Sequence, residues 1–279
     1  MALILALLSA AFYGTADFLG GLGARRAPPL AATVVAQGVG LAIAALALPF
    51  FPVPPPGRAG VLWGVGAGLT GGLGVALLYY GLAVGRVSVV APVTAVCSIS
   101  IPVLAAVGLG ERPVPAALAG IALAILSVGL ISRHGDPAGK PRGRDRSLVI
   151  ALAAGAAIGG FFVCLARAGE ASGLWPLLIA RVASTLALAA AAHLAGVRIA
   201  IPRKAVTVVV ACGALDMLAN ALYLVAVRLG PLGLVATLAS LYPASTVLLA
   251  RLVLGERLRP IQSVGLACAA IAIVLITTR

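Results

Sequence analysis

The chain has 279 residues, of which 62% are hydrophobic and only 10% are charged, and its mean hydropathy is +1.16. A water-soluble globular protein carries about a quarter of its residues as charged side chains, so this composition excludes an ordinary soluble enzyme. The formal net charge of +13 raises the question of nucleic-acid binding. The basic residues lie almost entirely between the apolar runs, however, where they fix membrane orientation. We therefore expect the lipid bilayer as a partner and no nucleic acid.

The apolar residues come in runs of roughly 20, which is the length of a helix that crosses a bilayer. These runs are continuous rather than alternating, and this favours helices over a barrel. The expected spans are 2–23, 31–50, 60–84, 88–109, 114–132, 148–168, 173–195, 204–228, 231–254 and 260–278. The sequence thus predicts an all-α, multi-pass protein of ten transmembrane helices in a cell inner membrane, with an uncleaved first helix.

One long polar stretch, residues 133–147, divides these spans into two sets of five. A shift of 145 residues aligns Gly110-Glu111-Arg112 with Gly255-Glu256-Arg257 without a gap. The same register pairs Gly85 with Gly230, Pro115 with Pro260 and Gly120 with Gly265. Such self-similarity indicates an internal duplication. We expect one five-helix repeat over 1–132, a linker over 133–147 and a second repeat over 148–279.

An odd number of helices in each repeat has a mechanical consequence. The second repeat must enter the membrane in the opposite sense to the first, so the two are expected to be inverted repeats. That arrangement recurs in secondary transporters whose substrate site lies near the bilayer midplane. The hypothesis that follows is alternating access around a central cavity between the halves.

A family resemblance supports this hypothesis. Two five-helix repeats, each with Gly-Glu-Arg after its fourth helix, resemble the EamA-type, ten-helix branch of the drug/metabolite transporter (DMT) superfamily. The opening segment, Ala10 to Gly21, also resembles the first helix of that branch. The resemblance implies export of amino acids or related metabolites, with YddG-type exporters of aromatic amino acids as the nearest analogue. It further implies a cavity lined by the spans 2–23, 60–84, 88–109, 148–168, 204–228 and 231–254.

Ionisable residues inside spans are costly and mark functional sites by default. Asp216 lies near the middle of 204–228, with Asn220 one turn later on the same face, and Arg181 lies in the first half of 173–195. Two interpretations remain open. Asp216 and Arg181 either form an interhelical ion pair that fixes packing, or they face the cavity and bind the amino and carboxylate groups of a zwitterion.

Asp17 lies in the second half of the first span. It either orients the end of this helix near Arg25 or acts as a proton-coupling carboxylate. The small multidrug resistance family, a relative in the same superfamily, uses a first-helix carboxylate in the second way. In the present sequence the residue is an aspartate and lies further along the helix.

Tyrosines are few, and all five lie within spans rather than clustering at span ends as an aromatic belt would. We expect Tyr13, Tyr79 and Tyr242 to line the cavity. Ser98, which precedes Pro102 in the fourth span, either hydrogen-bonds substrate or contacts neighbouring helices.

The sequence has no Walker A motif, no His-Glu-x-x-His and no Gly-x-Ser-x-Gly motif. We therefore expect no cofactor, no metal, no ATP hydrolysis by this chain and no enzymatic activity. The main alternative to metabolite export is proton-coupled multidrug efflux, and a membrane-embedded enzyme is the weaker one. The substrate is expected to be a small molecule, and the oligomeric state is left open, with a monomer plausible.

Two indications of orientation disagree. Most of the 20 lysines and arginines lie in the odd-numbered loops, including 133–147. Basic residues in short loops stay cytoplasmic, so the charge bias predicts periplasmic termini. Many ten-helix relatives are instead described with cytoplasmic termini. We follow the charge bias, because it extends over both halves of the chain.

Overall fold

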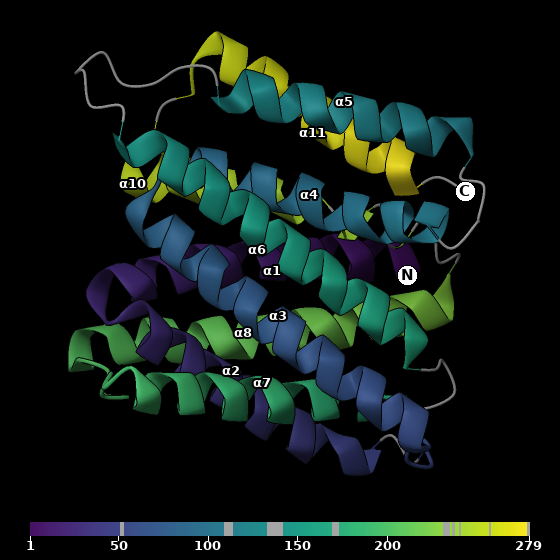
Figure 1. Cartoon of the computed structure of the whole chain (residues 1–279), viewed down its shortest axis with the longest axis vertical. Coiled ribbons are helices and arrows are strands. Elements are labelled where there is room, and N and C mark those ends of the chain that lie inside the picture. The colour runs from purple at the N-terminus through teal and green to yellow at the C-terminus, as the bar shows by residue number, and fades with distance from the viewer. Residues whose placement is uncertain are drawn as a thin grey trace.

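The computed structural model describes residues 1–50, 53–108, 114–132, 142–168, 173–230, 235, 238–239, 241–256 and 258–277. Within them it is all-helical, with ten α-helices and one short 3-10 helix. The helices are α1 (Ala2–Arg26), α2 (Pro29–Ala47), η1 (Leu48–Phe50), α3 (Arg58–Val84), α4 (Val87–Gly108), α5 (Pro115–Ser132), α6 (Arg142–Arg167), α7 (Trp175–Leu194), α8 (Arg203–Leu229), α10 (Tyr242–Leu254) and α11 (Pro260–Thr277). They lie roughly side by side in one bundle, with both termini at the same end (Figure 1).

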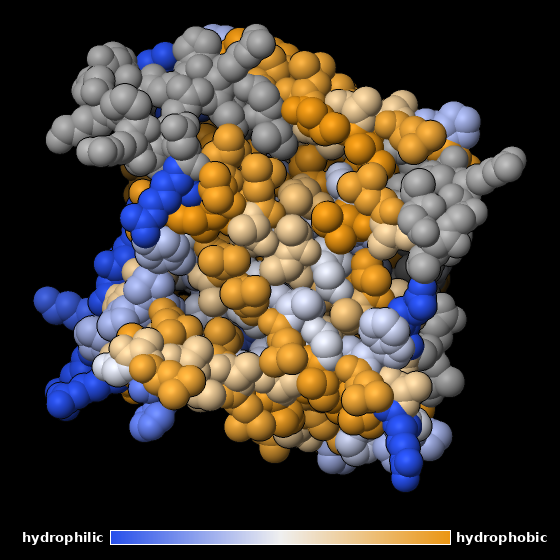
Figure 2. Space-filling model, in the orientation of Figure 1, coloured by the Kyte–Doolittle hydropathy of each residue, from blue (hydrophilic) through white to orange (hydrophobic). Residues whose placement is uncertain are grey.

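Six helices in the described part of the chain are long and apolar enough to cross a membrane: α1, α2 with η1, α3, α6, α7 and α8. Parts of α4, α5, α10 and α11 form shorter apolar helices. The apolar side chains also reach the outer surface of the bundle, where Leu46, Leu62 and Ile125 are more than two-thirds exposed. Figure 2 shows such apolar surface across the middle of the molecule, with hydrophilic side chains at its two edges. This arrangement suits a protein whose sides face lipid.

Proline sets the start of several helices. Pro29 and Pro176 lie in the first turn of α2 and α7, and α5 and α11 begin at Pro115 and Pro260. A proline at this position gives up no helical hydrogen bond, because the first amides of a helix have no partner within it. A glycine ends α10, where Gly255 follows the last helical residue in the left-handed conformation, with φ of 67°.

The expected span 231–254 is not one continuous helix. Leu241 is in a turn and α10 begins only at Tyr242. Pro243 explains the break, because it has no N–H to donate to the carbonyl of Ala239 and it restricts the residue before it. Among the residues that precede the break, Val235, Leu238 and Ala239 are helical, and 231–234, 236, 237 and 240 lie outside the described residues.

The other boundaries agree with expectation to within a few residues, apart from α6. This helix begins at Arg142 rather than at 148, so it includes the last part of the polar stretch 133–147. The rest of that stretch lies outside the described residues, as do Gly110, Glu111 and Arg112 of the first copy of the repeated motif. Charged residues such as Arg146 are compatible with a helix end that extends beyond the apolar span.

The helices of the first half pack against those of the second. α1 packs on α8 as α6 packs on α3, and α2 packs on α8 as α7 packs on α3. Likewise α1 contacts α10 as α6 contacts α4, while α5 packs against α11. Each of these contacts joins a helix from one side of the polar stretch to a helix from the other side. The centre of the molecule is therefore formed by both halves of the chain.

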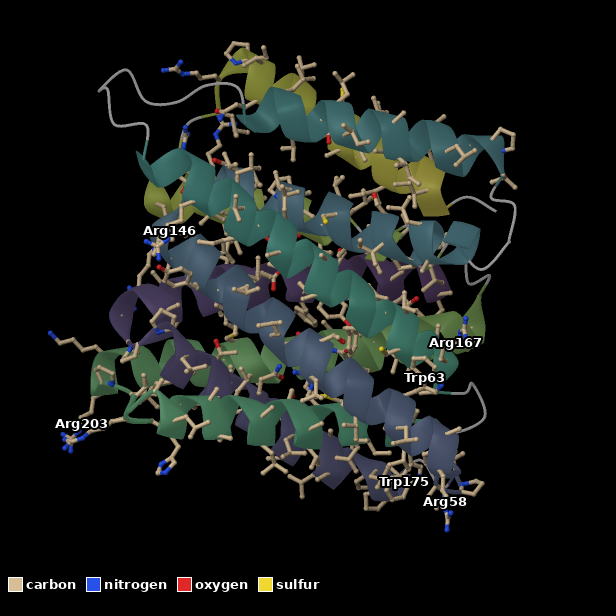
Figure 3. All side chains as sticks on the ribbon, in the orientation of Figure 1. Arg58, Trp63, Arg146, Arg167, Trp175 and Arg203 are labelled. Atoms are coloured by element: carbon tan, nitrogen blue, oxygen red, sulfur yellow. The ribbon has the colours of Figure 1, made fainter. Side chains whose placement is uncertain are left out.

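The two ends of the bundle differ in their side chains. Arg146 and Arg203 lie at one end, and Arg58 and Arg167 lie at the other, together with Trp63 and Trp175 (Figure 3). The Arg167 guanidinium lies over the Trp63 ring, 5.8 Å from its centroid. We call the end with Arg146 and Arg203 the basic end, because it carries the odd-numbered loops, and the other end the terminal end.

Candidate functional site

A cavity of about 380 Å³ lies between the two halves of the bundle. This volume is within the range of small-molecule sites, roughly 300–1,000 Å³. All eight residues singled out in the sequence line it: Tyr13, Asp17, Tyr79, Ser98, Arg181, Asp216, Asn220 and Tyr242. They come from α1, α3, α4, α7, α8 and α10, so the fold brings together residues that are far apart in the sequence.

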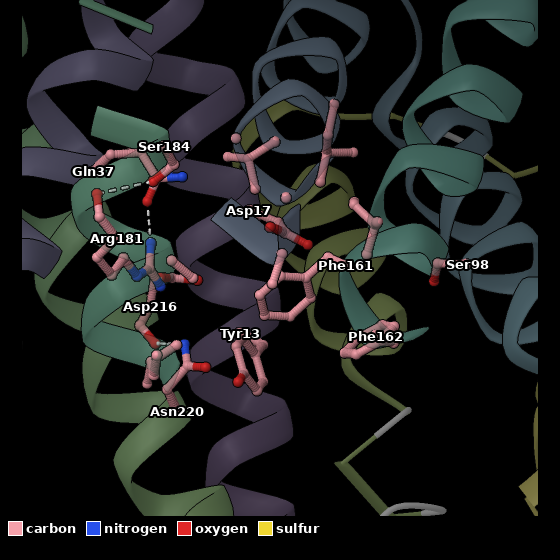
Figure 4. Close-up of a pocket in the computed structure, with 18 of the residues that line it drawn as sticks. Tyr13, Asp17, Gln37, Ser98, Phe161, Phe162, Arg181, Ser184, Asp216 and Asn220 are labelled. Atoms are coloured by element: carbon pink, nitrogen blue, oxygen red, sulfur yellow. Dashed lines mark hydrogen bonds and ion pairs between the residues drawn. The ribbon is translucent and has the colours of Figure 1, made fainter. Parts of the chain in front are cut away.

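The most strongly charged part of the lining is built around Arg181 of α7. Its guanidinium forms an ion pair with Asp216 of α8, and its other terminal nitrogen donates to the side-chain oxygen of Gln37 on α2 (Figure 4). The Arg181 and Asp216 side chains are 13% and 21% exposed, so both face the cavity. Three helices are thus joined through one cation. Asn220 turns back to its own helix and donates to the carbonyl of Asp216, at 2.7 Å.

Asp17 of α1 is a second carboxylate in the same cavity (Figure 4). It forms no hydrogen bond or ion pair with any residue that the structure describes. Arg25, the neighbour that could have oriented it, instead donates to the carbonyls of Leu82 and Gly85. Among the charged residues described in the lining, two carboxylates therefore accompany one guanidinium. With Asp17 ionised, the site would carry one more negative than positive charge, which a bound cation or proton would balance.

The opposite wall is apolar and aromatic. Phe161 and Phe162 of α6 contact each other edge to face, with centroids 5.3 Å apart, and face the cavity across from Arg181 and Asp216 (Figure 4). Tyr13 and Tyr242 lie 6.3 Å apart between their centroids. The cavity is therefore amphipathic, since α1, α2, α7 and α8 supply its charged and amide groups and α6 supplies aromatic surface.

Glycines on α3 allow the cavity helices to approach closely. A Cβ at Gly68 would lie 2.3 Å from the carbonyl oxygen of Ala180, and one at Gly71 would lie 2.8 Å from the Phe161 ring. Neither distance is compatible with a side chain, so glycine at both positions is required by packing. These residues fix the position of α3 against α7 and α6 at the level of the cavity.

Tyr79 closes the cavity on the side of the basic end. Its hydroxyl lies 3.1 Å from the Cys212 sulfur of α8, and the ring is only 3% exposed. Gly20 of α1 packs on this ring so tightly that a Cβ there would lie 2.4 Å from it. Tyr79 therefore lines the cavity while also sealing one of its ends.

Several lining residues have no counterpart among the sequence predictions. Gln37, Ser184, Phe161 and Phe162 all face the cavity. Gln37 could have been recognised as a polar side chain inside an apolar span, but the two phenylalanines carry no such signal. The cavity also takes residues from α2 and α7, beyond the six spans that the family resemblance implies. The Ser98 hydroxyl donates to the Ala95 carbonyl of its own helix at 2.9 Å.

Comparison with known proteins identifies the family. Residues 1–133 and 146–278 match the model of the EamA-like transporter family. The chain belongs to this family. EamA-like proteins form part of the drug/metabolite transporter superfamily, so this is a multi-pass membrane protein and a transporter of small molecules.

The fold is also found in a solved structure. One protein of known crystal structure is similar to this EamA-like chain. The two sequences are 16% identical, and the TM-score is 0.69. The similarity covers 98% of this chain and 94% of the other. At this identity the likeness concerns the fold alone. Among curated proteins, none matches the sequence.

Proposed function

We propose that this EamA-like protein is a secondary transporter that exports small amino-containing metabolites, foremost amino acids including aromatic ones, across a cell inner membrane. The observation that carries the proposal is the amphipathic cavity, in which the Arg181–Asp216 pair and Asp17, which has no partner among the described residues, face an aromatic wall. The export that we propose is analogous to that of YddG-type aromatic amino acid exporters.

The charged groups match an α-amino acid. The ammonium group is proposed to lie at Asp17 and Asp216, where excess negative charge favours a cation. The carboxylate is proposed to bind Arg181, whose planar guanidinium is suited to carboxylate recognition. To do so it displaces Gln37 or Asp216 from one edge of the guanidinium. Asn220, Ser98 and Tyr242 supply polar contacts around the substrate.

The apolar wall would receive the side chain of the substrate. Phe161 and Phe162 offer ring faces and edges opposite the charged wall, and Tyr13 adds a third ring near Asp216. Aromatic pairs contribute about 0.5–1.5 kcal/mol beyond the area that they bury. This is the reason to place aromatic amino acids among the substrates.

The mechanism that we propose is alternating access between inverted repeats, 1–132 and 148–279, of five transmembrane helices each. Three pairs of equivalent contacts between the halves support it: α1 with α8 and α6 with α3, α2 with α8 and α7 with α3, and α1 with α10 and α6 with α4. Glycines repeat the pattern in detail. A Cβ at Gly14 would meet α10 at Thr246 and Tyr242, and a Cβ at Gly159, 145 residues later, would meet α4 at Ile101.

Asp17 is also proposed to couple transport to protons, since a carboxylate without a partner in a membrane cavity can bind either a proton or a substrate cation. Proton-coupled multidrug efflux is the second candidate function. The observation in its favour is the aromatic and glycine-rich lining supplied by α3 and α6. The two functions differ in what Arg181 does, because a cationic drug has no carboxylate to bind there.

A transport measurement with three matched ligands tests the proposal. The purified protein is reconstituted into liposomes, which are loaded with radiolabelled phenylalanine. Efflux of phenylalanine is then measured in the presence of phenethylamine, which lacks the carboxylate, or of phenylpropionate, which lacks the amine. Amino acid export predicts saturable flux, weaker competition by phenethylamine and no competition by phenylpropionate. Equal or stronger competition by phenethylamine would favour multidrug efflux, and phenylalanine flux no greater than that of protein-free liposomes would contradict amino acid export.

A further inference from the structure

The basic end of the cavity is closed by three tightly packed helices. On α1, a Cβ at Gly21 would lie 2.5 Å from Leu82 of α3, and one at Gly23 would lie 2.9 Å from Val209 of α8. Leu82 and Val209 are at most 1% exposed. Substrate can therefore pass to the basic end only if α8, from the second half, separates from α1 and α3, from the first half.

Two charged residues hold the turn between α3 and α4 at this end. Arg25 of α1 donates from Nη2 to the carbonyl of Leu82 at 3.0 Å and to that of Gly85 at 3.3 Å. Glu256, which follows α10, accepts from the N–H of Val87 at 3.0 Å and from the N–H of Ser88 at 3.0 Å. A cation thus binds the carbonyl end of α3 and an anion caps the amide end of α4, as the partial charges of helix ends favour.

The two contacts differ in which halves of the chain they join. Arg25 attaches the turn to α1, so both partners belong to the first half. Glu256 belongs to the second half and attaches α4 of the first half to it. A movement that separates α4 from the end of α10 would break the Glu256 contact, whereas the Arg25 contact could persist.

Breaking this contact requires water. Val87 and Ser88 are 2% and 3% exposed, so without the carboxylate their two N–H groups would be buried donors with no acceptor. Water that enters as the basic end opens would satisfy them. Release of Glu256 and opening of this end are therefore coupled, and a static packing contact would show no such coupling.

We propose that Glu256 is the latch of the closed basic end: its carboxylate, by capping α4 across the two halves, stabilises the conformation in which the cavity is sealed from the basic loops. This assigns a role to the Gly-Glu-Arg motif, of which Gly255 and Glu256 form the described part. The inference rests on the alternating-access part of the proposed function, but it concerns no substrate.

The buried thiol of Cys212 reports whether the latch is closed. The probe protein retains Cys212 and has Cys97, Cys164 and Cys268 replaced by alanine. A membrane-impermeant maleimide is applied to the basic-loop face in membrane vesicles of either orientation. Glu256→Gln keeps the size of the side chain and removes its charge, and it should raise the labelling rate of Cys212 about tenfold, since hydrogen bonds to charged groups are the stronger ones. Ser263→Ala, at the start of α11 nearby, is the matched control and should leave the rate unchanged.

A second variant tests the same contact from the other partner. Val87→Pro removes one N–H that Glu256 accepts from, at a helix position where proline is tolerated, and should raise the labelling rate less than Glu256→Gln. Unchanged labelling in both variants would overturn the proposal, and so would an equal increase in Ser263→Ala or the loss of folded protein in both. The labelling experiment needs no substrate. A negative result would therefore contradict the role of Glu256 without bearing on the proposed substrate, which the transport measurement tests separately.

Discussion

Arg181 and Asp216 form an ion pair across α7 and α8 within the cavity, and both side chains remain partly exposed to it. A pair that served packing alone would gain nothing from this exposure. Its position opposite Phe161 and Phe162 instead gives the cavity one charged wall and one aromatic wall.

The first prediction concerns this pair. Asp216→Asn removes a charge that we assign to the substrate's ammonium group, so transport should fall to background while the protein still purifies as a monodisperse species. Loss of a partner from a fully buried pair costs about 3–5 kcal/mol, and exposure to the cavity should reduce that cost. Size-exclusion chromatography and liposome flux are the measurements. A variant that fails to insert or unfolds would make Asp216 a packing residue.

The charge-swapped double variant, Arg181→Asp with Asp216→Arg, is the companion to this test. It restores an ion pair, so stability should recover toward that of the unaltered protein. Transport should not recover, because carboxylate and guanidinium have exchanged places relative to the aromatic wall. Recovery of both properties would mean that the pair acts only through packing.

A second prediction concerns Tyr242, whose ring faces Tyr13 in the cavity. Tyr242→Ala should raise the half-saturating substrate concentration by roughly two- to tenfold, since aromatic contacts contribute about 0.5–1.5 kcal/mol. Tyr242→Phe keeps the ring and should change it less. Tyr79→Ala is expected to raise it as well, although that residue also seals the basic end. If the half-saturating substrate concentration is unchanged in both Tyr242→Ala and Tyr79→Ala, neither tyrosine belongs to the substrate site.

The third prediction concerns Gly14, which lies against the start of α10. The Thr246 hydroxyl donates to the Gly14 carbonyl at 3.0 Å, and a Cβ at Gly14 would lie 2.3 Å from the Tyr242 carbonyl oxygen. Gly14→Ala should destabilise the protein by about 1–3 kcal/mol through overpacking. Gly38→Ala is the control, since no atom lies within 4 Å of its added Cβ. Thermal unfolding in detergent compares the two, and equal midpoints would contradict the predicted α1–α10 contact.

Orientation gives a fourth prediction. The basic loops should be cytoplasmic, because basic residues in short loops are retained on that side, and both termini should then be periplasmic. Reporters fused after Arg279 test this: an alkaline phosphatase fusion should be active, whereas a fusion active only as a cytoplasmic reporter would reverse the assignment. In the predicted orientation, Tyr79 and Glu256 seal the cytoplasmic end.

Some features of the fold and of the candidate site could be predicted from the sequence, and others could not. Hydropathy and the two Gly-Glu-Arg motifs predict a helical membrane protein with a duplicated organisation, because burial in lipid leaves a strong compositional signal. Asp17, Arg181 and Asp216 could be identified because charge inside a span is rare and costly. Phe161 and Phe162 could not, since a phenylalanine facing a cavity and one facing lipid look alike in sequence.

Other features depend on contacts between distant segments. The break before Tyr242 lies within a continuous apolar run, so hydropathy predicts an unbroken helix there, and Pro243 alone signals the interruption. The contacts of Glu256 with Val87 and Ser88 join residues more than 160 positions apart. No local pattern in the sequence indicates which helix end that carboxylate would cap.

The most direct test of the central claim is substrate flux through the cavity. Radiolabelled phenylalanine efflux is measured from liposomes that contain either the unaltered protein or Asp17→Asn, with and without an imposed proton gradient. We predict saturable efflux that the gradient accelerates in the unaltered protein, and efflux in Asp17→Asn that is slower and no longer responds to the gradient. Efflux indistinguishable between the two proteins under both conditions would contradict a role for Asp17 and for the charged wall to which it belongs.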